Sequence, residues 1–400
     1  MDFQFPTQAD RQLAISNGNF VPENIIPIDV AVNYRSPLQN SRIFVTMPRF
    51  MAGVPITLGF VKHSTNVIEP YPNYKWHSSG GNDCDYMTSV FRVAFDTCNQ
   101  MWVLDSGKIG SNQVCQPKLL VFNLATDSLV KRFRIPSSFV TSTTLFITPI
   151  VDVKDPNTCR DVKVYIGDCC SFTIVVYDYA TDRAWQVNNK LFYPYPTYGT
   201  FRIAGESFEL MDGLLGMAIT NKKLRRTDSD RSLLFHALAS GVENAVELSV
   251  LNNETVWSQN QGYFMFSERF NIIGNRNIQT GAQAMDKNGN LFFVLLNPLA
   301  LVCWDSETVY KTENIKVVYQ NDQTMQFASG IKIVTNMAGE EEIWIVTNRL
   351  QKFMNGNVNK SEINYRIHVG VIRLLLNNHI KCNGQPVRQQ QQITFPYSRK

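Results

Sequence analysis

A repeated strand–turn–strand unit constrains the fold of this chain more than any other feature. The clearest copy is CDYMTSVFRVAFDTCNQMWVLDSG, residues 84–107. Residues 89–95 and 101–104 are β-branched, aromatic or otherwise apolar, whereas residues 96–99 (DTCN) have the composition of a tight turn. This stretch therefore predicts a β-hairpin whose second strand ends at a polar corner that contains Asp105.

Comparable hairpins recur along the chain. Six are predicted, each from two short apolar runs around a polar turn: 26–32 with 42–46, 89–95 with 101–104, 145–153 with 162–166, 214–219 with 232–238, 282–285 with 291–295, and 331–334 with 342–346. Further strands are expected at 56–61, 118–136 (two strands), 172–177, 245–250 and 299–304. Successive second strands are about 50 to 70 residues apart, which is typical of four-stranded propeller blades.

Several like sheets in one chain can form a closed ring of blades or a stack of sandwiches. A ring removes the exposed sheet edges that a linear array would leave unpaired, and no linker-like stretch separates the units. We therefore predict an all-β fold, a single-domain six-bladed β-propeller of four-stranded antiparallel blades over residues 21–384. Residues 1–20 are expected to form an N-terminal extension, and residues 385–400 a C-terminal tail. No long helix is expected, and LLLNN at 374–378 fits either a helical turn or a strand end.

Composition and charge argue against several classes of partner. The chain has 38 basic and 34 acidic residues and a net charge of +4, which is too balanced for an electrostatic nucleic-acid binder. No apolar run approaches the roughly 20 residues that a membrane-spanning helix needs. We expect no nucleic-acid partner, no membrane-spanning segment and no cofactor, and the sequence does not indicate the oligomeric state.

The eight cysteines provide a test of the predicted topology. The turns of first hairpins lie on one face of a propeller, so cysteines in such turns of neighbouring blades come within bonding range. On this basis and from the positions of the other cysteines, three disulfides are predicted: Cys98–Cys159, Cys84–Cys115 and Cys303–Cys382. Cys169 and Cys170 are left over, either as a strained vicinal disulfide or as two free thiols.

Disulfides favour an oxidising, extracellular location. Two N-glycosylation sequons, which begin at Asn253 and Asn359, fit the same location. The first residues, MDFQFPTQ, lack the basic and apolar regions of a signal peptide, so we expect the leader to be absent from this chain. The chain has no CxxC motif, and its five histidines lack ligand spacing, so no metal site is expected.

Several long strings resemble the insect yellow and major royal jelly protein family. They are FVPENIIPIDVAV, RIFVTMPRFMAGVPITL, TSVFRVAFDTCNQMWVLDSG, KLLVFNLATDSLVKRFRIP, GESFELMDGLLGMAIT and VCWDSETVY. The resemblance extends from about residue 20 to about residue 382 and implies a secreted six-bladed propeller. Members of that family are linked to cuticle pigmentation and melanin formation, to dopachrome conversion, to binding of biogenic amines in insect saliva, and to nutrition or sterol-associated assembly in royal jelly.

The resemblance also suggests ligand positions in the last blade. Amine-binding salivary members use a small polar residue, an asparagine and an aromatic residue there. By motif, Ser329 in FASGIKI occupies the first position and Asn348 in IWIVTNRLQKF the second, whereas the aromatic position holds Leu350. Loss of that ring removes a cation–π surface worth about 0.5–2 kcal/mol. The run TNRLQKF is closer to the royal jelly and yellow-e-like branch than to the salivary one.

Ligand sites of propellers lie at the mouth of the central channel. Candidate ligand-binding residues end or adjoin strands there: Arg49, Asp105, Asp168, His236, Asn297, Ser329, Asn348 and Leu350. The alternative for each polar residue is a structural role, in which a side chain satisfies backbone groups at a corner. For His236 the alternative is a packed, hydrogen-bonded core histidine.

Three functional hypotheses follow from these residues and from the resemblance. In the first, the propeller binds a small catechol, biogenic amine or sterol-like ligand at the channel mouth. In the second, it is a dopachrome-converting tautomerase, with His236 or Asp105 as the base and Arg49 or Asn348 as the donor to the developing phenolate. In the third, it is a structural or nutritive secreted protein. The sequence leaves open whether the chain is an enzyme.

Overall fold

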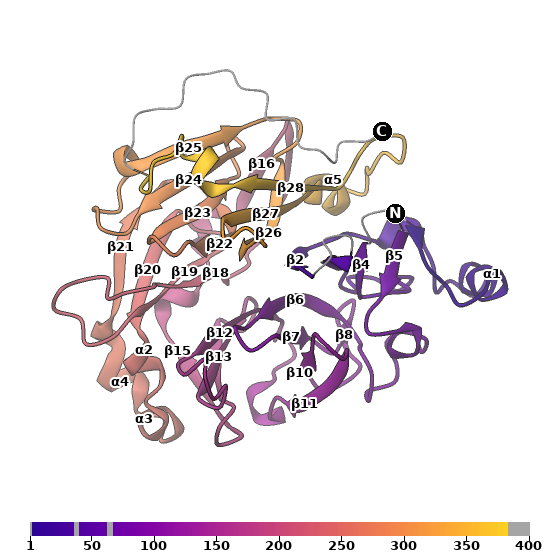
Figure 1. The fold of residues 1–400 in the computed structure, drawn as a ribbon, viewed down its shortest axis with the longest axis horizontal. Coiled ribbons are helices and arrows are strands. Elements are labelled where there is room, and N and C mark those ends of the chain that lie inside the picture. Colours follow the sequence, from indigo (N-terminus) through magenta and orange to yellow (C-terminus); the bar gives the residue numbers. More distant parts are fainter. Residues whose placement is uncertain (1, 36–39, 62–66, 383–400) are drawn as a thin grey trace. The chain divides into compact units, whose positions relative to one another are not determined.

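The computed structural model describes residues 2–35, 40–61 and 67–382, so the predicted tail at 385–400 lies outside the described residues. The prediction of an all-β fold is confirmed: six successive sheets of mainly antiparallel strands form a six-bladed β-propeller (Figure 1). The chain has two compact units, which we describe separately. Unit 1 comprises residues 1–166 and 177–184, and unit 2 comprises residues 167–176 and 185–400.

Unit 1 contains the first two sheets. The first, in the order β1-β5-β4-β3-β2, consists of β1 (Asp2–Phe3), β2 (Asp29–Asn33), β3 (Arg42–Thr46), β4 (Leu58–Val61) and β5 (Val67–Pro70). The second consists of β6 (Val90–Phe95), β7 (Gln100–Asp105), β10 (Lys118–Asn123) and β11 (Ser128–Arg134). Between β7 and β10 the chain forms a small separate hairpin of β8 (Lys108–Ile109) and β9 (Asn112–Gln113). Helix α1 (Gln8–Ser16) precedes β2, and β1 pairs in parallel with β5.

The third sheet contributes strand segments to both units. It consists of β12 (Phe146–Val153), β13 (Val162–Asp168), β14 (Thr173–Asp178) and β15 (Arg183–Asn188). A separate hairpin of β16 (Thr200–Ile203) and β17 (Glu206–Glu209) follows in unit 2.

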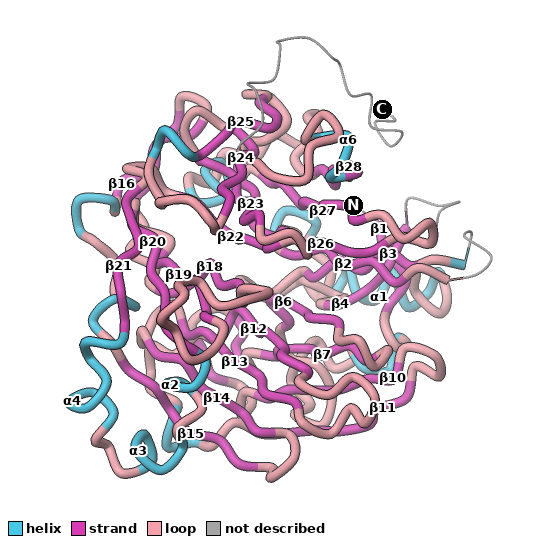
Figure 2. Tube along the Cα trace, turned by 60° about the vertical axis from the view of Figure 1, so that its left-hand side comes forward, coloured by secondary structure: helices cyan, strands magenta, loops and turns pink. Residues whose placement is uncertain are grey.

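Unit 2 also contains the last three sheets (Figure 2). The fourth is β18 (Leu214–Ile219), β19 (Ser232–Ala237), β20 (Val242–Glu247) and β21 (Phe270–Asn275), and the fifth is β22 (Thr280–Met285), β23 (Asn290–Leu295), β24 (Ala300–Asp305) and β25 (Ile315–Gln320). The sixth has three strands among the described residues, β26 (Phe327–Thr335), β27 (Glu341–Asn348) and β28 (Arg366–Val371). The helices of this unit are short: α2 (Leu248–Leu251), α3 (Glu254–Ser258), α4 (Gly262–Phe266), α5 (Leu350–Met354) and α6 (Ile372–Leu375).

One hairpin turn is repeated in three blades, and its side chains explain why the sequence forms it. Asp96 accepts hydrogen bonds from the N–H groups two and four residues later, at 2.8 and 2.9 Å. Asp286 and Asn336 do the same in the fifth and sixth sheets. The third residue after each acceptor has a positive φ, and it is Asn99, Gly289 or Gly339. These residue types satisfy the turn locally, which is why the hairpins are visible in the sequence.

The hydrophobic core lies between adjacent sheets. In unit 2, Leu234 and Ala245 of the fourth sheet pack against Phe293 and Val302 of the fifth, and all four are buried. Strands that are covered on both faces read as continuous apolar runs, such as LFFVL in β23. Each fully buried Leu or Phe side chain contributes about 1.5–3 kcal/mol, so stacking of sheets supplies most of the driving force.

The strand expected at 245–250 is wrong in its second half, because the chain turns into α2 at Leu248. Two indole N–H groups explain the helical turn: Trp185 donates to the Leu251 carbonyl at 2.8 Å, and Trp257 donates to the Val250 carbonyl at 2.9 Å. These bonds give additional partners to carbonyls at the end of the helix. The segment at 374–378, left open between two structures, begins within helix α6.

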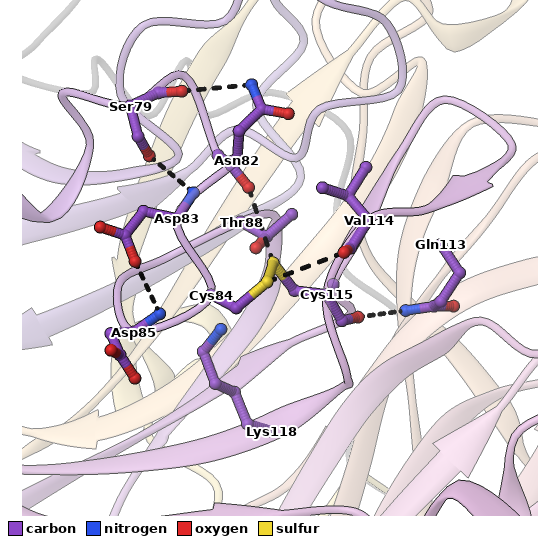
Figure 3. Close-up of a disulfide and its surroundings, with 12 residues drawn as sticks. Ser79, Asn82, Asp83, Cys84, Asp85, Thr88, Gln113, Val114, Cys115 and Lys118 are labelled. Atoms are coloured by element: carbon purple, nitrogen blue, oxygen red, sulfur yellow. Dashed lines mark hydrogen bonds between the residues drawn. A yellow bond between two sulfur atoms is a disulfide. The ribbon is translucent and has the colours of Figure 1, made fainter.

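The structure contains all three predicted disulfides: Cys84–Cys115, Cys98–Cys159 and Cys303–Cys382. The first joins the segment before β6 to the segment before β10, and Thr88 and Lys118 lie close to it (Figure 3). Cys169 and Cys170 are free thiols. No helix in the described part of the chain is both long and apolar enough to cross a membrane.

Candidate functional site

Three loops of unit 2 are joined by backbone hydrogen bonds where strands of the third and fourth sheets end or begin. The N–H of Gly213, just before β18, donates to the Cys169 carbonyl at 2.7 Å. Leu238, just after β19, donates to the Gly213 carbonyl at 2.8 Å, and Ala239 donates to the Asp212 carbonyl at 3.0 Å. These bonds fix the backbone of the corner that follows β13 against the segment that leads into β18, and so fix the side chains that the two carry.

A carboxylate and two thiols meet at this junction. The Cys170 thiol donates a long hydrogen bond, 3.9 Å, to the Asp212 carboxylate, and the Sγ atoms of Cys169 and Cys170 are 3.1 Å apart. Cys169 is buried, whereas Cys170 and Asp212 are partly exposed. Burial raises the pKa of Asp212 to about 6, against a smaller lowering by the Cys170 hydrogen bond. An accessible carboxyl group with a pKa near neutrality is suited to acid–base chemistry.

An aromatic pair lies beside Gly213, the residue that follows Asp212. The rings of Phe172 and Tyr193 are 4.6 Å apart between centroids. The Phe172 ring packs directly on Gly213, where an added Cβ would approach its Cδ1 atom to 2.3 Å. Tyr193 is 52% exposed, so one side of the aromatic pair faces solvent. Together with Asp212 and Cys170, these rings define what we call the Asp212 cluster.

The backbone of Phe172 is in a strained conformation. Its φ is +58°, a left-handed conformation that costs a residue with a side chain about 1–2 kcal/mol. The positive-φ position holds an asparagine, aspartate or glycine in several other turns, for example Asn99, Asp127 and Gly289, although the corner before β24 has a leucine, Leu299. Strain at a position where cheaper residues are available is typical of functional sites.

The three donor groups of this cluster do not fit a metal ion. One ligand atom from each of Cys169, Cys170 and Asp212 lies within 4.8 Å of the others, so the set is a formal candidate. Two thiolates on one tetrahedral zinc ion, with bonds of about 2.3 Å, would be separated by roughly 3.8 Å. The two sulfur atoms are only 3.1 Å apart, a distance at which they hydrogen bond to each other. We therefore treat the cluster as a thiol–carboxylate site.

His236, a candidate base, belongs to a different and fully buried network in unit 2. Its Nδ1 is 2.8 Å from a carboxylate oxygen of Glu243, and its Nε2 is 2.9 Å from the Gly281 carbonyl. Both ring nitrogens therefore already have a hydrogen-bond partner within the protein. Its side chain is 0% exposed, which favours the structural role.

The other members of this network complete the hydrogen bonding of Glu243. Arg276 donates to the same carboxylate oxygen at 3.0 Å, and Gln283 donates to the other oxygen at 2.9 Å. Arg276 also donates to the Ser240 carbonyl at 3.2 Å. The network connects strands of the fourth and fifth sheets through the buried Glu243 carboxylate.

Arg49 and Asp105, both in unit 1, are likewise surrounded by backbone groups. The Arg49 guanidinium donates to the carbonyls of Val54 and Thr88, and burial lowers its pKa to about 10 while Asp105 raises it. The Asp105 carboxylate accepts hydrogen bonds from three backbone N–H groups, those of residues 88, 89 and 107, and forms an ion pair with Lys118 at 3.1 Å. This is the corner role that the sequence offers as the alternative for Asp105.

The remaining candidates lie in the third, fifth and sixth sheets. Asp168 is buried at the end of β13 and accepts hydrogen bonds from the N–H groups of residues 170 and 171. Asn348 donates to the Ser329 hydroxyl at 3.1 Å and accepts from the Leu350 N–H at 3.0 Å, so these three lie together and are buried. Asn297 is exposed in the corner after β23.

The chain was compared with known proteins, and one family model matches most of it. The model of major royal jelly protein matches residues 88–380. The chain belongs to the yellow and major royal jelly protein family. The resemblance seen in the sequence is thereby confirmed.

Three relatives illustrate the range of the family. Dopaminechrome tautomerase of Drosophila melanogaster is 33% identical over 397 residues, which cover 96% of this chain and 82% of that protein. Major royal jelly protein 9 of Apis mellifera is also 33% identical, over 96% of this chain and 88% of that protein. Protein yellow of Drosophila subobscura is 28% identical over 95% of this chain and 65% of its own length.

Sequence reasoning missed Asp212. The residue stands in the string GESFELMDGLLGMAIT, directly before Gly213 and an apolar strand, where it has the pattern of an ordinary turn. Its partner Cys170 is 42 positions earlier in the chain, so no motif joins them. Two features of the sequence could have indicated this site. They are the cysteines left without a disulfide and the aromatic residue Phe172, which stands at a turn position suited to asparagine or glycine.

Proposed function

We propose that this protein is a tautomerase of aminochromes, the cyclised ortho-quinones that form from catecholamines, with Asp212 as the base. The observation that carries the proposal is the partly exposed Asp212, whose chain neighbour Gly213 packs against the ring of Phe172, the partner of Tyr193. The Drosophila melanogaster relative named dopaminechrome tautomerase, 33% identical over nearly the whole chain, supports this choice of substrate class.

The main catalytic requirement of this reaction is a base that removes a proton from carbon. Conversion of an aminochrome into a dihydroxyindole moves hydrogen from saturated carbons of the five-membered ring to the quinone oxygens. A base must take a proton from carbon, and it must be ionised at working pH without being too weak to accept the proton. A pKa of about 6 at Asp212 meets both conditions, and general-base catalysis contributes about 10²–10⁴-fold.

The aromatic pair would hold the planar substrate. Phe172 and Tyr193 offer ring surface for stacking, and aromatic contacts of this kind contribute about 0.5–1.5 kcal/mol beyond area burial. The backbone bonds that anchor Cys169 to Gly213 and Asp212 to Ala239 keep the base and the ring of Phe172 in a fixed relation. Such preorganisation is what a proton transfer from carbon requires.

A turnover assay tests this proposal. Dopaminechrome, generated by oxidation of dopamine, is followed by loss of its visible absorbance with wild-type protein and with Asp212→Asn. We expect the wild type to accelerate the conversion and the variant to lose about 100-fold or more of kcat. His236→Gln serves as a matched control in a second ionisable network. Equal rates for wild type and Asp212→Asn would contradict the role of Asp212.

A second candidate function is binding without turnover. The exposed side of Tyr193 and the strained Phe172 favour an aromatic ligand even if no proton is transferred. Calorimetric titration with dopamine and serotonin, run beside the turnover assay, separates the two. Saturable heat without conversion identifies a carrier of catechols or amines, and the absence of both identifies a structural or nutritive protein.

We further propose that the protein is secreted and glycosylated. Three disulfides support an oxidising location. Of the two sequon asparagines, Asn359 is exposed, whereas Asn253 is partly buried and caps helix α3 by accepting a hydrogen bond from the Val256 N–H at 3.2 Å. Glycosylation is therefore expected mainly at Asn359, which peptide mass spectrometry of the secreted protein would test.

A further inference from the structure

Cys170 is the accessible thiol of this chain. Six of the eight cysteines form disulfides, and Cys169 is buried. Cys170 is partly exposed and belongs to the corner that also presents Phe172. Cys170 is a free thiol in a chain that forms three disulfides, and it shares its corner with one ring of an aromatic pair. Its chemistry therefore needs an explanation.

Two neighbouring side chains, those of Asp212 and Cys169, favour reaction of the Cys170 thiol. Asp212 accepts the hydrogen bond of the Cys170 thiol at 3.9 Å, so a proton acceptor is already in place. The hydrogen bond with Cys170, together with burial, raises the pKa of Cys169 well above its ordinary value. Cys169 thus keeps its proton and can donate it, over 3.1 Å, toward the sulfur of Cys170 when that sulfur becomes negative.

We propose that Cys170 is a nucleophile that forms a covalent adduct with ortho-quinones, with Asp212 as the acceptor of the thiol proton. This deepens the proposed function, on which it rests only for the class of ligand. Quinones are soft, planar electrophiles, and the rings of Phe172 and Tyr193 lie beside the sulfur-bearing corner to receive them. The site thereby captures a quinone that is not isomerised.

The addition balances without an external oxidant or reductant. The sulfur of Cys170 forms a bond to a ring carbon of the quinone, and the electron pair of the ring double bond moves to a quinone oxygen. The thiol proton passes through Asp212 to that oxygen. The hydrogen on the attacked carbon then moves to the second oxygen as the ring becomes aromatic, and the product is a catechol thioether.

Labelling of the full-length protein with its disulfides intact tests the proposal. The probes are 4-methyl-1,2-benzoquinone and N-ethylmaleimide, a thiol reagent without a catechol-like ring, and peptide mass spectrometry locates each adduct. We expect a single quinone adduct, on Cys170, which is lost in Cys170→Ser and retained in Cys169→Ser. Adducts elsewhere, or no adduct, overturn the proposal. So does an intact mass two hydrogens lower, which would mean that Cys169 and Cys170 are joined.

Two further variants examine the neighbours. Asp212→Asn should slow labelling of Cys170 at pH 7 by tenfold or more for both probes, because the proton acceptor is lost. Faster labelling would mean that the carboxylate merely repels the thiolate, and would remove its assigned role. Tyr193→Ala should reduce the preference for quinone over N-ethylmaleimide several-fold, whereas an unchanged preference would mean that the rings do not recruit the quinone.

The two proposals fail in different ways. An adduct on Cys170 without any turnover of dopaminechrome leaves the nucleophile in place and removes the tautomerase. Turnover that depends on Asp212, without any adduct on Cys170, leaves the tautomerase in place and removes the nucleophile.

Discussion

Two carboxylates of unit 2, Glu243 and Asp212, show how the same group serves stability in one place and chemistry in another. Glu243 receives hydrogen bonds from His236, Arg276 and Gln283 and is 0% exposed. Asp212 is partly exposed, and its donor is the neutral thiol of Cys170. The Arg276 guanidinium supplies a positive charge to Glu243, whereas burial without a cation raises the pKa of Asp212 to about 6. The partners of a carboxylate, rather than its burial, decide its role.

The largest effect is expected on stability at Glu243. Glu243→Gln leaves the positive charge of Arg276 buried without a counter-charge, which should lower the free energy of unfolding by about 3–5 kcal/mol. Asp212→Asn is the matched control. Because the folded state raises the pKa of Asp212, the ionised form is disfavoured there at neutral pH, so its removal should leave stability unchanged or slightly higher. Urea unfolding at pH 7 measures the stability of both variants. Similar losses of unfolding free energy in the two would mean that the two carboxylates do not differ in their contribution to stability.

The second effect is on the pH dependence of turnover. A base works only when ionised, so kcat/KM should rise about tenfold per pH unit below pH 6 and become level above it. The groups that face Asp212 and could shift this midpoint are Cys170 and Cys169, with Asp168 behind them. Initial rates between pH 4.5 and 8 with wild type and Asp212→Asn provide the measurement. An inflection that persists in the variant would assign the base to another group.

The smallest effect is expected at Phe172. Phe172→Asn removes a left-handed strain of about 1 kcal/mol but also loses the ring contacts with Tyr193 and Gly213, so the free energy of unfolding should change by less than about 1 kcal/mol. KM for dopaminechrome should nevertheless rise several-fold. Leu299, which also has a positive φ (62°) in a strand corner of unit 2, provides the control Leu299→Asn. A large loss of stability with unchanged KM would mean that the Phe172 ring is a packing residue.

Most of the fold could be predicted because the signals are local. The turns at Asp96, Asp286 and Asn336 combine side-chain acceptors with residues that tolerate positive φ, and all of that information lies within five residues. The disulfides followed from the order of the hairpins. The error at α2 had a distant cause, since the indoles of Trp185 and Trp257 that satisfy its carbonyls come from other segments.

The site was harder to predict than the fold, because the sequence does not show in which direction a side chain points. Asp105 ends β7 and Arg49 lies in the loop after β3, but both side chains are directed into backbone groups. His236 is on a strand as expected, yet the carbonyl of Gly281 and the carboxylate of Glu243 occupy both of its nitrogens. Conversely, Asp212 looks like a turn residue until burial and the approach of Cys170 are known.

The self-contained turns also have a consequence for how the chain folds. Asp96, Asp286 and Asn336 complete their hydrogen bonds with residues two to four positions away, so each hairpin can form before any distant segment has been found. Short-range contacts close quickly and lose little chain entropy. Folding therefore starts at several hairpins independently, and the slow step is the later stacking of preformed sheets.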